Sequence, residues 1–292
     1  GGVLVSLTAT AAPRPRATRI AVTSGKGGVG KTSLTINLAV AMARIGHRVG
    51  ILDADFALGN IDVMLGLTPE QHLGSVLDGL RNVQDVMIDG PSGIRIIPAG
   101  SGVRSLTALD DARWLRLVEA IDEAGRDLDF LFFDTATGIS DNVLDLIRVA
   151  DYALVVTSYD PAAVVDAYAV IKLISAADMS KPIGVVVNSA RDSEEGGLVF
   201  RQISLAAERF LGRSIRYDGH VLEDRMVKEA VFSQTPLMLT SDVAGPATGC
   251  IRRVASRLVA ARHNGPGGPW PAPPRLVDRS SPAGTMEAPR CA

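Results

Sequence analysis

The sequence predicts an α/β fold in which helices flank both faces of a doubly wound, mainly parallel β-sheet. Apolar, strand-like runs alternate with helical patterns along most of the chain. Several runs, such as "IGVVVN", are apolar almost throughout, which is typical of strands covered on both faces. In such sheets ligands bind beyond the carboxyl ends of the strands. The polar residues that follow each run are therefore the first candidates for a functional site.

The predicted elements lie between residues 18 and 263. The predicted strands are 19–24, 48–54, 94–99, 129–135, 152–158, 183–189 and roughly 215–221. The predicted helices are 31–45, 110–124, 140–149, 161–176, 198–211 and 246–263. In the first helix Leu34, Leu38, Met42 and Ile45 fall on one side, which predicts an amphipathic helix.

The two ends of the chain differ in composition from the region between them. Residues 1–17 hold a short apolar run with no basic residues before it, so we expect a disordered leader and not a signal peptide. Residues 264–292 are rich in Pro and Gly, which predicts a disordered tail. The sequence thus predicts one domain over 18–263 with two disordered ends.

Composition and charge narrow the classes of function. Apolar residues make up 47% of the 292 residues, which is enough for a substantial core. No apolar run is long enough to predict a membrane-spanning helix. The net charge of −2 excludes a strongly basic nucleic-acid-binding chain and leaves a local basic patch open. Cys250 and Cys291 are far apart and lack metal-ligand spacing, which fits a reducing cytoplasm.

The stretch "SGKGGVGKTS" contains the full phosphate-loop motif G-x-x-x-x-G-K-[ST] between a predicted strand and a predicted helix. Its glycines let backbone N–H groups turn toward phosphate oxygens, and the helix N-terminus adds the positive end of a dipole. We expect Lys31 to reach the β- and γ-phosphates and the Thr32 hydroxyl to ligate Mg²⁺. A glycine-rich turn without a ligand is the alternative, which the strand and helix context disfavours. The predicted nucleotide-binding residues of the loop are Gly25, Lys26, Gly27, Gly28, Val29, Gly30, Lys31, Thr32 and Ser33.

Polar residues at the ends of three further strands complete the candidate site. Asp53 and Asp55 follow the second strand, where one of them could orient or deprotonate an attacking water. Solvated loop carboxylates or helix caps are the alternative for this pair. Asp134 ends the run "DFLFFD", where a carboxylate can hold Mg²⁺ together with Thr32, and Asp53 is a further candidate metal ligand. Asn188 could read an adenine edge or only form a turn.

The segment "SGKGGVGKT" is identified as the deviant Walker A motif, K-G-G-x-G-K-[ST], of the MinD/ParA class of P-loop ATPases, with a SIMIBI-type fold. This resemblance covers roughly residues 18–263 and implies a homodimer that forms with ATP and Mg²⁺. In this class the first lysine, here Lys26, reaches across the dimer interface to the phosphates of the partner's ATP. The resemblance also implies that Asp55 is the catalytic aspartate, Asp134 the switch II aspartate and Asn188 the adenine-reading residue.

Within this class the chain is most similar to the flagellar-number regulators called FlhG, FleN or YlxH. The likeness lies in "DADFALGNIDVMLGL", "FDTATGISDNVLDLIRVAD" and "PAAVVDAYAVIKLI". It implies an ATP-driven switch for flagellar number or placement, with a signal-recognition-type GTPase or a transcription activator as partner. No D-Q-A-x-x-L-R segment, which stimulates such a GTPase in flagellar members, is found at the N-terminus, either because the chain differs there or because the sequence is truncated. Thr137 stands where Ala is usual.

The last predicted helix, "IRRVASRLVAARH" over 251–263, is amphipathic and basic. We expect it to dock on the sheet, as such helices commonly do, although it could also lie on anionic lipid at the inner face of the cell membrane. Its basic residues could instead form a DNA-binding patch on the assembled dimer. The apolar face consists of Ile251, Val254, Ala255, Leu258 and Val259, and the patch of Arg252, Arg253 and Arg257.

Particular residues favour or disfavour the other functions that are known in this class. A ParA-type partitioning ATPase that binds DNA nonspecifically and a MinD-type division-site regulator stay open beside the flagellar role. Iron–sulphur-carrying relatives need paired cysteines, which Cys250 and Cys291 do not offer. The tyrosine kinases of the class carry a tyrosine-rich tail, whereas the last tyrosine here is Tyr217. If Asp55 does not activate water, the protein would be a switch that binds ATP without hydrolysing it.

Overall fold

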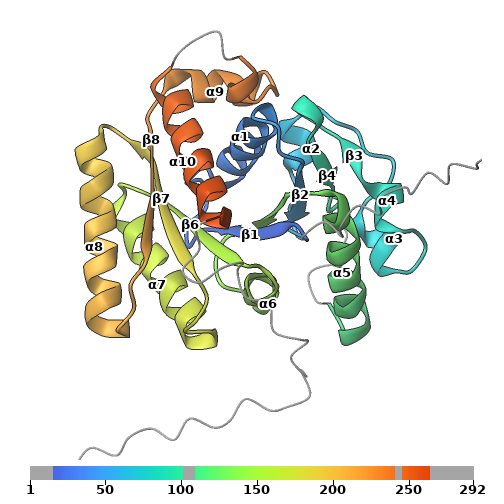
Figure 1. The fold of residues 1–292 in the computed structure, drawn as a ribbon, viewed down its shortest axis with the longest axis horizontal. Helices are drawn as coiled ribbons and strands as arrows, with labels where there is room; N and C mark the ends of the chain where they lie inside the picture. The colour runs from blue at the N-terminus through green and yellow to red at the C-terminus, as the bar shows by residue number, and fades with distance from the viewer. Residues whose placement is uncertain (1–15, 101–108, 241–244, 264–292) are drawn as a thin grey trace, which may run out of the picture.

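The computed structural model describes residues 16–100, 109–240 and 245–263 of the chain. Within them eight strands form one sheet (Figure 1). The strands are β1 Thr18–Thr23, β2 Val49–Ala54, β3 Ile88–Asp89, β4 Arg95–Ile97, β5 Phe130–Thr135, β6 Tyr152–Ser158, β7 Ile183–Ala190 and β8 Arg216–Leu222. Their order is β3-β4-β2-β5-β1-β6-β7-β8, and every neighbouring pair is parallel except β3 and β4. The predicted fold class is confirmed.

Helices cover both faces of this sheet (Figure 1). One face carries α1 Lys31–Arg44, α2 Ile61–Met64, α9 Arg225–Phe232 and α10 Pro246–His263. The other face carries α3 Leu73–Leu77, α4 Val83–Val86, α5 Asp111–Ala124, α6 Asp141–Val149, α7 Pro161–Ala177 and α8 Ser193–Leu211. The described residues also include the short 3₁₀ turns η1 Pro91–Gly93, η3 Gly125–Asp127 and η4 Leu237–Leu239.

The central strand β5 shows why the strand sequences are apolar throughout. Phe130 and Phe132 point into the core beneath α1 and α10, while Leu131 and Phe133 point into the core on the opposite face. All four side chains are fully buried. A strand with both faces covered alternates its side chains between two dry layers, so it needs apolar residues at every position.

The seven predicted strands and six predicted helices are all present, with their ends shifted by a few residues. The largest shift is at α8, which begins at Ser193 because the Asp192 side chain caps it by accepting from the Glu195 N–H at 2.8 Å. Strand β3 and the helices α2, α3, α4 and α9 were not predicted. Each has eight residues or fewer, which is too short for a clear periodic pattern.

The prediction that α1 is an amphipathic helix with Ile45 on its apolar side is wrong in part. Leu34, Leu38 and Met42 are buried as expected, but Ile45 is 59% exposed because the helix ends at Arg44. The helix is buried on other sides as well, since it contacts α10, α2 and η4 in addition to the sheet. Its sequence is therefore that of a largely buried helix and not of an amphipathic surface helix.

Helix α10 docks on the sheet, as its sequence predicts. Ile251, Val254, Ala255 and Leu258 are buried, and Val259 is partly buried against the same core. Two of its arginines also bond the sheet: Arg257 donates to the Asp218 carbonyl and Arg262 to the Asp129 carbonyl, both at 2.9 Å. The apolar face is thus in use within the domain. None of the described helices is both long and apolar enough to cross a membrane.

The described chain begins just before β1. Ala17 is buried, and the Arg16 guanidinium pairs with Asp151 at 2.5 Å. Ala17 thus packs in the core and Arg16 binds the folded domain, although both residues fall inside the predicted leader 1–17. The rest of that leader and the predicted tail 264–292 lie outside the described residues, so the proposed division into domain and disordered ends stays a prediction.

Candidate nucleotide-binding site

The loop between β1 and α1 lies at the carboxyl end of the central strands, where the motif predicts it. Gly28 and Gly30 have left-handed φ angles of 78° and 85°, which glycine adopts without strain. A Cβ atom at Gly25 would lie 2.4 Å from the Asp166 carbonyl oxygen of α7. One at Gly30 would lie 2.3 Å from the Asn188 amide nitrogen. These glycines are required by backbone conformation and by close neighbours.

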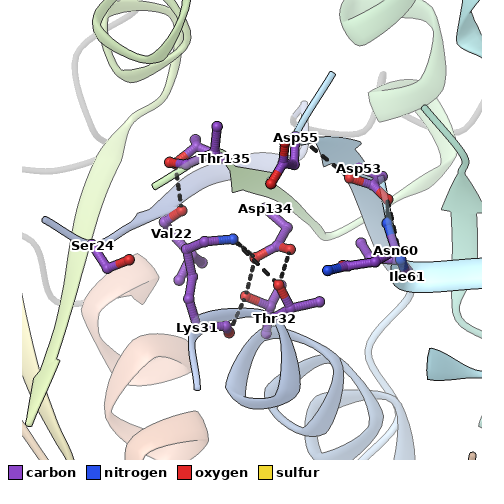
Figure 2. A network of polar contacts seen from close by, with 12 residues as sticks. Val22, Ser24, Lys31, Thr32, Asp53, Asp55, Asn60, Ile61, Asp134 and Thr135 are labelled. Carbon is purple, nitrogen blue, oxygen red and sulfur yellow. Dashed lines mark hydrogen bonds and ion pairs between the residues drawn. The ribbon is translucent and has the colours of Figure 1, made fainter. Parts of the chain in front are cut away.

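Lys31 and Thr32 meet Asp134 inside this loop (Figure 2). The Lys31 ammonium lies 2.8 Å from Asp134 Oδ1, and the Thr32 hydroxyl donates to Asp134 Oδ2 at 2.7 Å. Thr35, one turn further along α1, donates to Asp134 Oδ1 at 3.0 Å. Both charged groups are buried, with side-chain exposures of 6% for Lys31 and 0% for Asp134. The fold thus gathers a cation, two hydroxyls and a carboxylate at one buried point.

This donor set fits Mg²⁺ and a phosphate chain. The Thr32 hydroxyl and the Asp134 carboxylate are hard oxygen ligands of the kind that Mg²⁺ prefers, and they lie on the loop and on the adjacent strand. Lys31 and the turned glycine backbone offer positive groups to phosphate oxygens. The metal and phosphate roles of Lys31, Thr32 and Asp134 remain predictions that this geometry supports.

Asp53 lies beside Asp134, as its cross-strand partner in the β2–β5 pair. Burial, and then the charge of Asp134, raise the pKa of Asp53 from 3.8 to about 7. Its Oδ2 accepts the Asn60 and Ile61 N–H groups at 2.9 and 3.2 Å, and its Oδ1 accepts the Asp55 N–H at 3.2 Å. Both oxygens therefore tie down the loop from β2 to α2. If Asp53 binds Mg²⁺ as predicted, its oxygens must bind the metal ion in addition to these N–H groups.

Asp55 lies in that loop at the carboxyl end of β2, near the site shown in Figure 2. It is partly exposed, and its Oδ1 accepts the Leu58 N–H at 3.1 Å. A carboxylate that is held by its own loop and open to solvent can contact a water molecule. The predicted role in orienting water remains a prediction for this residue.

Lys26 does not join the cluster around Asp134. Its ammonium lies 2.5 Å from Asp160 Oδ2, and the exposures are 39% for Lys26 and 45% for Asp160. Asp160 caps α7 by accepting the Ala162 N–H at 2.8 Å, and the bond from Lys26 holds the pKa of Asp160 below its usual value. Sequence reasoning did not identify Asp160 as this partner. The signal was the Asp-Pro pair that opens α7.

Asn188 faces the loop from β7 and borders a cavity of about 300 Å³. Its amide nitrogen donates to the Val29 carbonyl at 2.7 Å, which fixes the side chain against the phosphate loop. From there the cavity extends to α9, which sequence reasoning missed. A largely apolar cavity beside a phosphate loop suits a purine base. Its apolar lining includes Val221, Leu222, Val227, Val231, Phe232, Leu237 and Ile251.

A glycine loop of this geometry at the carboxyl edge of a parallel sheet defines a P-loop NTPase. The family model described as "ParA: NUBPL iron-transfer P-loop NTPase" matches residues 16–195, and the chain belongs to this ParA family. P-loop NTPases of this family are ATPases, so the chain belongs to a nucleotide-binding family.

Individual relatives narrow the resemblance. The chain is 41% identical to antiactivator FleN of Pseudomonas aeruginosa over 215 residues, which are 74% of this chain and 77% of FleN. It is 31% identical to flagellum site-determining protein YlxH of Helicobacter pylori, over 73% of this chain and 72% of YlxH. In the solved MinC:MinD cell division complex of Aquifex aeolicus, one chain matches with a TM-score of 0.67 and 28% identity, covering 84% of this chain and 96% of that chain. The predicted resemblance to the MinD/ParA class and its FlhG/FleN branch is confirmed.

Proposed function

We propose that this protein is a slow ATPase that acts as an ATP-dependent dimerising switch and controls the number or placement of flagella. The observation that carries the switch is the position of the first lysine of the loop, Lys26, which lies outside the cluster formed by Lys31 and Asp134. The flagellar role is supported by the 41% identity to FleN and the 31% identity to YlxH.

The chain's own residues divide the work on ATP. Lys31 and the glycine loop hold the β- and γ-phosphates, and Asn188 with the apolar cavity holds the base. Thr32 and Asp134 would hold Mg²⁺, which neutralises charge on the phosphates when bound. Asp55 orients the attacking water, while Asp53 keeps the loop around Asp55 closed through three backbone N–H groups.

Lys26 adds the link between hydrolysis and assembly. Two protomers close face to face over the nucleotides, and Lys26 of each leaves Asp160 to contact the phosphates bound by its partner. A cation that touches the developing charge in this way accelerates phosphoryl transfer by roughly a thousandfold or more, the scale of an arginine finger. Loss of the γ-phosphate then loosens the loops at Asp55 and Asp134, and the dimer separates.

The variant Lys26→Ala tests this proposal. It keeps the fold and ATP binding, because Lys26 contacts neither Asp134 nor the base cavity. It loses ATP-dependent dimerisation and hydrolysis, which light scattering and phosphate release measure. A variant that still forms a dimer with ATP would contradict the switch. The flagellar role is tested by counting flagella on cells that carry only the Lys26→Ala protein; an unchanged count contradicts that role.

Partner and location belong to the same proposal. A signal-recognition-type GTPase or a transcription activator would read the dimer in the cytoplasm. Peripheral membrane contact through 251–263 would require α10 to leave the sheet, since its apolar face is buried. DNA binding remains an alternative because Arg252 and Arg253 are exposed on α10. Tight, salt-sensitive DNA binding with ATP would favour a ParA-type partitioning role.

A further inference from the structure

Gln234 occupies a backbone position that normally belongs to glycine. It follows the end of α9 with a φ of 50°. Its N–H bonds the Val231 carbonyl at 3.1 Å, and the next N–H, of Thr235, bonds the Ala230 carbonyl at 3.0 Å. These are the two bonds of a Schellman motif, in which the left-handed residue is usually glycine. A glutamine there costs stability relative to glycine, so its side chain is expected to contribute something that glycine cannot.

The Gln234 side chain reaches α2, which lies far away in sequence. Its amide nitrogen donates to the Val63 carbonyl at 2.6 Å. A Cβ atom at Gly66 would lie 3.2 Å from Gln234 Oε1, so the side chain lies directly over the turn that ends α2. Gly66 itself has a left-handed φ of 63°, which shapes this turn. Gln234 is exposed, so burial in the core does not explain its position.

The two helices that Gln234 joins have different tasks. Helix α9 forms one wall of the base cavity through Val227, Lys228, Val231 and Phe232. Helix α2 closes the loop that carries Asp55, and Asp53 fixes its start through the Asn60 and Ile61 N–H groups. One end of α2 is thus held by the carboxylate next to Asp134, and the other end by the helix that borders the base cavity.

We propose that Gln234 is a positioning residue that couples the seating of the base to the Asp55 loop. This inference rests on the proposed ATPase function. A base in the cavity contacts α9 and limits its movement, and the Gln234–Val63 bond passes this restraint to α2. With both ends of α2 held, the loop between Asp53 and Asn60 has less freedom, and Asp55 is kept in position for water.

Two substitutions separate this role from that of a helix stop. Gln234→Gly favours the left-handed turn but has no side chain to bond Val63. Gln234→Asn also tolerates the left-handed conformation and keeps a carboxamide, but it is one methylene too short for the bond. Ser92→Gly is the matched control, because Ser92 is another exposed residue with a positive φ, of 56°, and its glycine variant relieves the same strain at η1.

The kinetic test compares the effects of each substitution on kcat and on KM for ATP. Both Gln234 variants should lower kcat for ATP by about fivefold to tenfold, the lower range of typical coupling effects, with KM for ATP changed by less than about twofold. Ser92→Gly should change neither constant. A Gln234→Gly protein with wild-type kcat would overturn the proposal, since the turn alone would then explain the residue.

Hydrogen exchange gives a readout that does not depend on turnover. In the wild type, Mg²⁺·ATP should protect residues 53–67 more than Mg²⁺·tripolyphosphate does, because tripolyphosphate has no base. In both Gln234 variants the two ligands should protect 53–67 equally, while ATP still protects the phosphate loop. ATP-specific protection of 53–67 that persists in the variants would overturn the coupling. If ATP protects nothing in the wild type, the proposed ATPase function itself fails.

Discussion

Lys26 and Lys31 belong to one loop, yet the fold treats them differently. Lys31 is buried and bonded to a fully buried carboxylate, with two hydroxyl groups completing the cluster. Lys26 is partly exposed and bonded to Asp160, a helix cap that is also partly exposed. A buried pair loses much when one partner is removed, whereas an exposed pair contributes little to stability. Lys31 is therefore fixed, and Lys26 is free to exchange its partner.

The largest expected effect comes from removing Lys31 from its buried ion pair with Asp134. Lys31→Ala leaves Asp134 buried without its cation and should destabilise the nucleotide-free protein by about 3 kcal/mol. It should also weaken ATP binding by about a hundredfold or more. Urea unfolding and titration with a fluorescent ATP analogue measure the two effects. Lys26→Ala is the control, with both quantities unchanged; equal losses in the two variants would contradict the distinction.

The stability of the folded protein should depend on pH through Asp53, the buried neighbour of Asp134. Burial raises the pKa of Asp53 to about 7 in the folded protein from 3.8 in the unfolded chain, so the folded state holds an extra proton between these values. Its contribution to stability is full below pH 3.8 and is lost as the pH rises to about 7, with a slope of at most roughly 1.4 kcal/mol per pH unit.

Asp53→Asn should remove this dependence. Urea unfolding without Mg²⁺, at pH 5 and pH 8, gives the stability of the wild type relative to the variant. That relative stability should fall from pH 5 to pH 8, because only the wild type has to ionise the Asp53 carboxyl group. A difference that is the same at both pH values would mean that Asp53 is already ionised at pH 5.

The smallest expected effect comes from changing the partly exposed ion pair between Lys26 and Asp160. Asp160→Asn keeps the cap on α7, since Asn caps helices about as well as Asp, but it removes the charge that binds Lys26. The ATP-dependent dimer should tighten by about twofold to fivefold, which ultracentrifugation with ATP can resolve. Asp192→Asn makes the same change at the cap of α8 and should have no effect. A weaker Asp160→Asn dimer would contradict a restraining role for Asp160.

Most of the fold was predictable because its strands are apolar on both faces and its long helices have clear patterns. The fixed half of the site was also predictable, since Lys31, Thr32 and Asp134 occupy motif positions and strand ends that a parallel sheet brings together. Motif spacing and strand patterns were enough to predict where these residues lie.

The rest depends on contacts between segments distant in sequence. The bond from Lys26 to Asp160 spans 134 residues, and that from Gln234 to Val63 spans 171. No local pattern predicts either contact, since the Asp-Pro pair at Asp160 marks only the cap of α7. Helix α9, with eight residues, is too short for its periodicity to predict the wall of the base cavity.

Mixing two inactive variants shows whether Lys26 acts on the ATP that is bound to the partner protomer. Lys26→Ala protein retains Asp55, and Asp55→Ala protein retains Lys26; each should bind ATP and show little hydrolysis alone. In a mixed dimer, the ATP on the Lys26→Ala protomer has its own Asp55 and receives Lys26 from the other protomer. Mixing should therefore restore phosphate release at this site. If the mixture is no more active than its components, Lys26 does not act across the dimer.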